Sequence, residues 1–343
     1  MKTIAYFDSS HDMPEEILAA AGFIPYKIFG DIHTPNDAAD RYLSAFFCPA
    51  ARSFLTEALT RSEQWEGIVV AQGCNATNRH YDVWKRHVQT PFLYWFNTPL
   101  KDDAPAMRFM KAELWRLIDA LDKHFRAVVN AESLTMAIHE SNRLKKRLQT
   151  LAALRSTRDM ANREYLEILL LSMRLPKAET IAQVDTLIAA VEKRGPFPAN
   201  KKKMLLTGSD VTYPEFMDLL DEAGFRVVRD DHSVGERYFA TLIAEDGDPV
   251  EALARYYLSI PKPATKLSMR GRIDYLLQAV AESKLDTVVS QNLKFCEPYA
   301  FDAVLVNAAL KEKGCRVLHV EREYTPGPDS QLLNRLAAFA EML

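Results

Sequence analysis

The stretch TIAYFDSSHDMPEEILAAAGFIPYKI, residues 3–28, has the pattern of a strand, a loop, a helix and a second strand. An apolar run opens it, Pro14 stands where the first turn of a helix tolerates proline, and Gly22 stands where a helix can end. The same chemistry recurs in residues 214–225, where Pro-Glu is again followed by Ala-Gly-Phe. This faint repeat predicts two related α/β lobes.

Further candidates for buried strands follow in both lobes. Short apolar runs occupy residues 67–71 and 92–96 in the first lobe and residues 287–290 and 316–320 in the second. Helical stretches separate these runs, and strands that alternate with helices form mostly parallel sheets. The predicted fold class is therefore α/β, with two flavodoxin-like parallel-sheet lobes.

The middle of the chain has a different pattern. Leu114, Leu117 and Leu121 recur at helical spacing, and no glycine occurs from residue 102 through residue 194. A Gly-Pro-Phe-Pro break then precedes the second lobe. We therefore predict an N-terminal α/β lobe with two cysteines, a helical region, and a C-terminal α/β lobe with the third candidate cysteine, over residues 1–104, 105–198 and 199–343.

The composition excludes several classes of protein. The 343 residues include 43 Lys and Arg against 46 Asp and Glu, whereas a general nucleic-acid binder usually carries a basic surplus. The sequence has no run of about 18 apolar residues that would predict a transmembrane helix, and its N-terminal apolar stretch is too short for a secretory signal. It also has no P-loop and no G-x-G-x-x-G fingerprint. We expect a cytoplasmic protein that binds neither nucleic acid nor a membrane and does not hydrolyse ATP itself.

The sequence contains four cysteines, none in a C-x-x-C pair, which we interpret as free thiols, catalytic thiols or metal ligands. Cys74 and Cys296 each follow a predicted buried strand, at the strand ends where open α/β sheets bind ligands. Cys48 precedes a proline and a predicted helix, whose N-terminus favours a thiolate. Cys315 precedes the predicted strand 316–320 and is expected to be buried and structural.

Two interpretations of the first three cysteines are open on these spacings. Thiols from three loops can converge on one iron–sulfur cluster and leave one iron without a protein thiolate. Such an open position lets a metal act as a Lewis acid on a carbonyl or hydroxyl oxygen. Alternatively, the three are unrelated buried residues, because free cysteine is among the most buried residue types. The spacing by itself does not decide between the two.

Longer stretches around these cysteines resemble a known family. Over nearly the whole chain, the sequence is similar to the subunits of 2-hydroxyacyl-CoA dehydratases and benzoyl-CoA reductases. The matching stretches keep the order and spacing of that family: Cys48-Pro49, GCNATNRHYDVWK (73–85), DDHSVGERYF (230–239) and KFCEP (294–298). The sequence departs from the family at Asn75, where Asp is frequent, and at Ser233, where many members have Cys. These departures leave the three cysteine positions untouched.

The resemblance implies that Cys48, Cys74 and Cys296 hold a [4Fe–4S] cluster. It implies an acyl-CoA substrate and a homologous cluster-bearing subunit as partner, either a different chain in a heterodimer or a second copy in a homodimer. It also implies a separate ATP-hydrolysing iron–sulfur activator that delivers single electrons in a transient contact. That division of labour agrees with the missing P-loop. An oxygen-sensitive, anaerobic enzyme is expected.

Three activities are compatible with the resemblance. A 2-hydroxyacyl-CoA dehydratase is a lyase in which one electron on the thioester carbonyl gives a ketyl radical anion that expels the neighbouring hydroxyl. A benzoyl-CoA reductase is an oxidoreductase that consumes electrons in reducing an aromatic ring. Other members carry clusters for electron transfer or small-molecule reduction. We prefer the dehydratase interpretation and keep the other two as alternatives, because the sequence does not separate them.

Polar residues outside the cysteine stretches are further candidates. His33 follows the second predicted strand and could face a substrate as an acid or hydrogen-bond donor; the alternative is a solvated loop. Arg237 could hold a CoA phosphate, but a structural ion pair is the simpler interpretation. The Lys201 to Lys203 run is expected to be solvated and could attract CoA phosphates or an acidic partner.

Overall fold

The computed structural model describes residues 2–327 and 329–343. The first lobe contains β1 (Thr3–Phe7), α1 (Glu15–Ala20), β2 (Ile24–Lys27), α2 (Asp37–Asp40), α3 (Pro49–Arg61), the 3-10 helix η1 (Ser62–Gln64), β3 (Gly67–Ala71), α4 (Asn75–His87) and β4 (Leu93–Phe96). The helical region contains α5 (Ala104–Phe125), α6 (Ala131–Leu154), α7 (Asn162–Ser172) and α8 (Lys177–Glu192). The second lobe contains β5 (Lys202–Gly208), α9 (Glu215–Glu222), β6 (Phe225–Asp230), α10 (Glu236–Phe239), α11 (Pro249–Ser259), α12 (Met269–Ser283), β7 (Thr287–Leu293), α13 (Glu297–Glu312), β8 (Arg316–Arg322) and α14 (Ser330–Glu341).

The strands in the described part of the chain form two four-stranded sheets with equivalent orders, β2-β1-β3-β4 and β6-β5-β7-β8. All pairings are parallel; Ile4 of β1 aligns with Gly67 of β3, and Leu205 of β5 aligns with Val288 of β7. This is the order of the first four strands of flavodoxin-like folds. The predicted fold class, an α/β protein with two parallel-sheet lobes, is confirmed.

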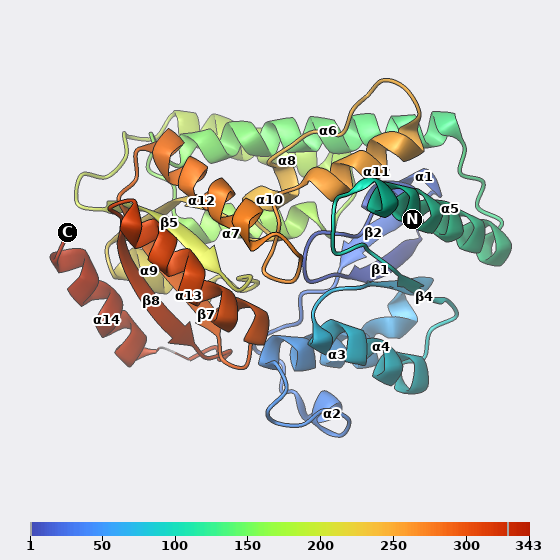
Figure 1. Cartoon of the computed structure of the whole chain (residues 1–343), viewed down its shortest axis with the longest axis horizontal. Helices are drawn as coiled ribbons and strands as arrows, with labels where there is room; N and C mark the ends of the chain where they lie inside the picture. Colours follow the sequence, from blue (N-terminus) through green and yellow to red (C-terminus); the bar gives the residue numbers. More distant parts are fainter. Residues whose placement is uncertain (1, 328) are drawn as a thin grey trace.

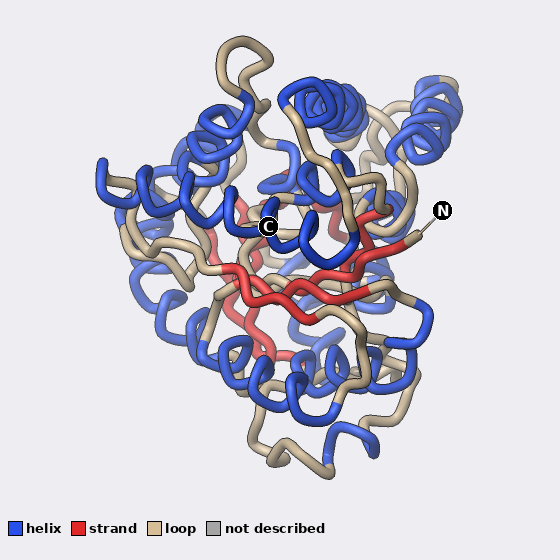
Figure 2. Tube along the Cα trace, turned by 90° about the vertical axis from the view of Figure 1, so that its right-hand side faces the viewer, coloured by secondary structure: helices blue, strands red, loops and turns tan. Residues whose placement is uncertain are grey.

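Alternating side chains cover both faces of each sheet. In β1, Ile4 and Tyr6 belong to one apolar core, whereas Ala5 and Phe7 belong to another on the opposite face. The central strand β7 is buried along its whole length, as expected for a parallel strand with helices on both sides. Figure 2 shows the strands in the middle of the molecule with helices around them.

The helical region lies against both lobes. The long helix α6 runs along the top of Figure 1, and α7, α8 and α10 share an apolar core with it. Although α11 follows the second-lobe strand β6, it packs on α5 and α6, and its Leu253 and Tyr257 join the core that contains Ile4. The division at 104/105 and 198/199 stays a prediction. Among the described helices, none is sufficiently long and apolar to cross a membrane.

A buried ion pair connects α1 to the helical region. Glu16 lies 3.3 Å from Lys145 Nζ of α6, and both side chains are 1% exposed. The carboxylate of Glu16 also accepts hydrogen bonds from the hydroxyls of Ser141 and Tyr257, each at 2.7 Å. Because an unpaired charge in the interior is strongly unfavourable, this network fixes how α1, α6 and α11 lie together.

Candidate metal centre

Three cysteines lie at the N-terminal ends of helices. Cys48, Cys74 and Cys296 are the residues directly before α3, α4 and α13. Pro49 and Pro298 occupy the first turns of α3 and α13, where the missing N–H of proline costs little. The N–H groups of the first turns have no partner within their own helix, so these ends favour negative charge near the sulfurs.

Cys74 and Cys296 occupy equivalent positions in the two lobes. Cys74 follows β3 and Cys296 follows β7, and each of these strands is the third of its lobe and pairs with the first. The strand order of each sheet reverses at this point, and ligands of open α/β sheets bind at the carboxyl ends of the strands there. Cys48 comes from the connection between β2 and β3.

The three cysteines line one cavity of about 100 Å³ between the lobes. Cys48 and Cys74 line it from the first lobe, and Cys296 lines it from the second. The helices that follow them, α3, α4 and α13, are near the junction of the two lobes in Figure 1. The wall also contains apolar side chains, among them Phe7, Phe29, Phe54, Val234 and Leu293. The structure thus brings together the three residues that the sequence predicts as ligands.

The thiols in this cavity influence one another's ionisation. Burial, together with the nearby sulfurs of Cys296 and Cys74, raises the pKa of the Cys48 thiol to about 12. Burial also raises the pKa of the Cys296 thiol, and the nearby Ser209 hydroxyl acts in the opposite direction. Closely spaced thiolates need a compensating positive charge. A metal centre supplies that charge, because it binds cysteine in the deprotonated form.

Three thiols are a donor set that an iron–sulfur cluster can take. Within residues 2–327 and 329–343, no three His, Cys, Asp or Glu side chains are grouped as ligands of one ion. Thiolates are also the soft ligands that such clusters take.

Comparison with known proteins places the chain in a family. Residues 11–343 match the family described as 2-hydroxyglutaryl-CoA dehydratase, D-component. The chain belongs to this family. The resemblance to 2-hydroxyacyl-CoA dehydratase subunits that the sequence indicates is thereby confirmed.

Three relatives of this D-component chain have low sequence identity to it but match it over nearly its full length. It is 23% identical over 336 residues to the (R)-phenyllactyl-CoA dehydratase beta subunit of Clostridium sporogenes. It is 23% identical over 341 residues to the lactoyl-CoA dehydratase subunit beta of Anaerotignum propionicum, and 24% identical over 344 residues to the putative dehydratase subunit YjiM of Escherichia coli (strain K12). Each alignment covers 96% of this chain and 89% of the relative. All three relatives are named as dehydratase subunits.

His33, the remaining candidate from the sequence, is not among the residues that line the cysteine cavity. Its Nε2 lies 2.7 Å from Oε1 of Glu215, at the start of α9, and its side chain is 59% exposed. His33 therefore links the first lobe to the second at the surface of this D-component chain.

The substitution His33→Ala is expected to have a small effect. An exposed ion pair contributes no more than about 1 kcal/mol, so the free energy of unfolding should change by less than that. The rates at which iodoacetamide alkylates the three cavity cysteines in the metal-free protein should stay those of the parent. Urea denaturation and mass spectrometry of the alkylated protein measure the two quantities. Altered thiol reactivity would show that His33 belongs to the site, whereas a loss of several kcal/mol would show that its contact with Glu215 stabilises the fold more than a surface ion pair does.

The structure also places Arg237 and Cys315 in the interior. Arg237 is fully buried, donates to the Tyr299 hydroxyl at 2.9 Å and lies 3.8 Å from Asp210. This burial favours the structural interpretation over a CoA phosphate site. Cys315 is 7% exposed and belongs to the apolar core beneath α12 and α13, as the sequence predicts.

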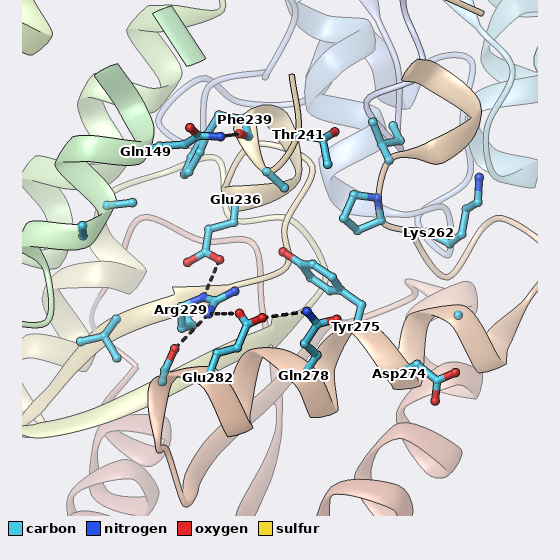
Figure 3. A pocket seen from close by; sticks show the side chains of 18 of the residues that line it. Gln149, Arg229, Glu236, Phe239, Thr241, Lys262, Asp274, Tyr275, Gln278 and Glu282 are labelled. Carbon is cyan, nitrogen blue, oxygen red and sulfur yellow. Dashed lines mark hydrogen bonds and ion pairs between the residues drawn. The ribbon is translucent and has the colours of Figure 1, made fainter. Parts of the chain in front are cut away.

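A larger cavity, of about 1120 Å³, lies elsewhere in the chain and is lined in part by α6, α10 and α12 (Figure 3). Its charged side chains already pair with one another: Arg229 Nε donates to Glu236 at 2.7 Å, and Arg229 lies 3.6 Å from Glu282. No cysteine is among the residues that line it. The smaller cavity is therefore the candidate centre, because it contains the residue types with the required chemistry.

Sequence reasoning assigned no role to two hydroxyl residues in the cysteine cavity. Thr77 Oγ1 lies 3.2 Å from Cys74 Sγ, and Ser209 lines the cavity together with Cys296. Thr77 could have been found, since it follows a candidate ligand by three residues at the start of a helix. Ser209 comes from the end of a different strand, β5, and no spacing in the sequence relates it to Cys296.

Proposed function

We propose that this protein is the cluster-bearing subunit of a 2-hydroxyacyl-CoA dehydratase-type enzyme, with a [4Fe–4S] cluster held by Cys48, Cys74 and Cys296. The observation that carries the proposal is the convergence of these thiols, from both lobes, on one cavity in a member of the D-component family. When bound, a cluster with three thiolate ligands supplies one-electron chemistry and an open iron that can act as a Lewis acid.

The proposed substrate is a 2-hydroxyacyl-CoA thioester. The relatives include subunits of phenyllactyl-CoA and lactoyl-CoA dehydratases, which supports dehydration over the reduction of an aromatic ring. Apolar side chains in the cavity wall would limit water around a bound thioester, and electrostatic interactions are stronger where water is excluded.

Two carboxylates also line the cavity. Asp8 accepts a hydrogen bond from Lys27 Nζ at 2.6 Å, and both side chains are buried, so Asp8 is committed to this ion pair. Asp210 is 21% exposed; its Oδ1 accepts a hydrogen bond from the N–H of Ser233 at 2.6 Å, its Oδ2 accepts one from the Ser233 hydroxyl, and Arg237 lies 3.8 Å away. Asp210 is the more exposed of the two carboxylates, and we assign it to accept a further hydrogen bond from the hydroxyl of the substrate.

The proposed enzyme needs further proteins. The relatives from Clostridium sporogenes and Anaerotignum propionicum are named as beta subunits, which supports a homologous partner subunit here. The sequence has no P-loop, so a separate ATP-hydrolysing iron–sulfur activator would deliver electrons in a transient contact.

The test is an anaerobic assay of the purified chain. With lactoyl-CoA or phenyllactyl-CoA, ATP and dithionite, the chain alone should give no sustained turnover, because it lacks the means to couple ATP hydrolysis to electron delivery. Addition of a homologous subunit and an ATP-hydrolysing activator should start the formation of the unsaturated acyl-CoA, followed by chromatography. A 2-hydroxyacyl-CoA ester should also change the EPR spectrum of the reduced protein. Sustained ATP-dependent turnover by the chain alone, or a spectrum that no acyl-CoA changes, contradicts the proposal.

A further inference from the structure

A buried hydroxyl contacts the sulfur of Cys74. Thr77 is 1% exposed and lies in the first turn of α4, three residues after Cys74. Its Oγ1 lies 3.2 Å from Cys74 Sγ. Buried hydroxyl groups are satisfied by hydrogen bonds in nearly all proteins, and within the described residues this hydroxyl takes the sulfur as its partner.

A second buried hydroxyl lines the cavity that contains Cys296. Ser209 is 3% exposed, and its Oγ accepts a hydrogen bond from the Leu293 N–H at 3.0 Å. That bond leaves the O–H of Ser209 free to donate, and Ser209 lines the same cavity as Cys296.

The direction of hydrogen bonds to these sulfurs follows from the chemistry of a metal-bound thiolate. Cysteine loses its proton when it binds a metal, so the sulfur can only accept. The hydroxyls of Thr77 and Ser209 must then be the donors. A donated hydrogen bond draws negative charge from the sulfur, and it is stronger in a poorly hydrated cavity than in water.

We propose that Thr77 and Ser209 raise the reduction potential of the centre by donating hydrogen bonds to the sulfurs of Cys74 and Cys296. This inference rests on the proposed function, because it assumes a cluster on the three cysteines. Reduction adds one electron from dithionite or the activator, transfers no proton, and increases the negative charge on the cluster and its ligands. Hydrogen bonds to the sulfurs stabilise that added charge, and they are one of the features that set cluster potentials.

The experiment is a redox titration of the anaerobically purified protein, followed by EPR, with the iron content measured for each variant. Thr77→Val removes the hydroxyl at nearly constant volume and should shift the midpoint potential to a more negative value. Thr77→Ser keeps the hydroxyl and should stay close to the parent. Ser209→Ala should shift the potential in the same direction as Thr77→Val, and the double variant should shift it further than either single variant.

Thr180 offers a matched control. It is fully buried in α8, where its hydroxyl donates to the Pro176 carbonyl at 3.1 Å, and it is not among the residues that line the cysteine cavity. Thr180→Val should therefore leave the potential unchanged.

Three outcomes separate this inference from the proposed function. A midpoint potential in Thr77→Val and Ser209→Ala equal to that of the parent, at equal iron content, overturns the inference alone. Loss of iron from Thr77→Val with retention in Thr77→Ser also overturns it, because the hydroxyl would then serve assembly of the centre. Absence of iron from the anaerobically purified parent overturns the proposed function, and the inference with it.

Discussion

Replacement of Cys48, Cys74 or Cys296 by serine is expected to remove most of the iron from the anaerobically purified protein and to bleach its broad brown absorbance. Serine is a harder ligand than cysteine and binds iron–sulfur clusters poorly. Removal of a residue that only hydrogen-bonds to a metal ligand typically lowers metal affinity or activity about 10–100-fold. Removal of a ligand itself should therefore have a larger effect. Iron and sulfide analysis, with an assay in the presence of the partner subunit and activator, measures the effect.

The fourth cysteine supplies the control for these variants. Cys315 is buried in a separate apolar core and does not line the cavity. Cys315→Ser should therefore keep the iron content of the parent, although a polar hydroxyl in this core should cost some stability. Full iron occupancy in all three ligand variants would refute the cluster assignment.

The second large effect is expected on stability. Glu16→Leu should lower the free energy of unfolding by about 3–5 kcal/mol, because it leaves the ammonium group of Lys145 buried without its carboxylate. The hydroxyls of Ser141 and Tyr257 lose their acceptor as well. Equilibrium urea denaturation followed by circular dichroism measures the change.

The double variant Glu16→Leu/Lys145→Met distinguishes the unpaired charge from lost packing. Apolar residues of similar volume can replace a buried ion pair at little cost, so the double variant should regain most of the stability that Glu16→Leu loses. If the double variant is as unstable as Glu16→Leu, the ion pair is not the cause.

The same pair makes the stability of the parent depend on pH. Burial works against the charged form of Glu16, but Lys145 and the hydrogen bonds from Ser141 and Tyr257 outweigh it and hold the pKa of Glu16 below its ordinary value of 4.5. Because the pKa is lower in the folded than in the unfolded state, the stabilisation is complete above about pH 4.5 and is lost as the pH falls through the folded-state pKa. In that acid range the parent should lose stability more steeply than the double variant.

The fold class could be predicted from the sequence because it depends on local patterns. Apolar runs such as residues 3–7 and 67–71 are β1 and β3 in the structure, and the repeat at 214–225 contains α9 and the start of β6. The strand predicted over residues 287–290 extends to Leu293 as β7. The last three residues of β7 include Gln291 and Asn292. Their polar side chains do not fit the apolar pattern from which a buried strand is predicted. Gln291 is tolerated there because Arg322 Nε donates to its side-chain oxygen at 2.7 Å, a contact made only after folding.

For the candidate site, the sequence alone placed each cysteine next to a predicted strand end or helix start, since proline and apolar runs mark those positions locally. It also indicated the family, through matches that keep their order along the chain. The presence of Cys48, Cys74 and Cys296 in one cavity was decided only by the tertiary structure. Local patterns place a residue within its own lobe, whereas the distance between sulfurs from two lobes depends on how the lobes are held together. The lobes are held together by contacts between residues far apart in the sequence, such as the buried pair of Glu16 and Lys145 and the packing of α11 against the core that contains β1. No spacing within the chain predicts these contacts.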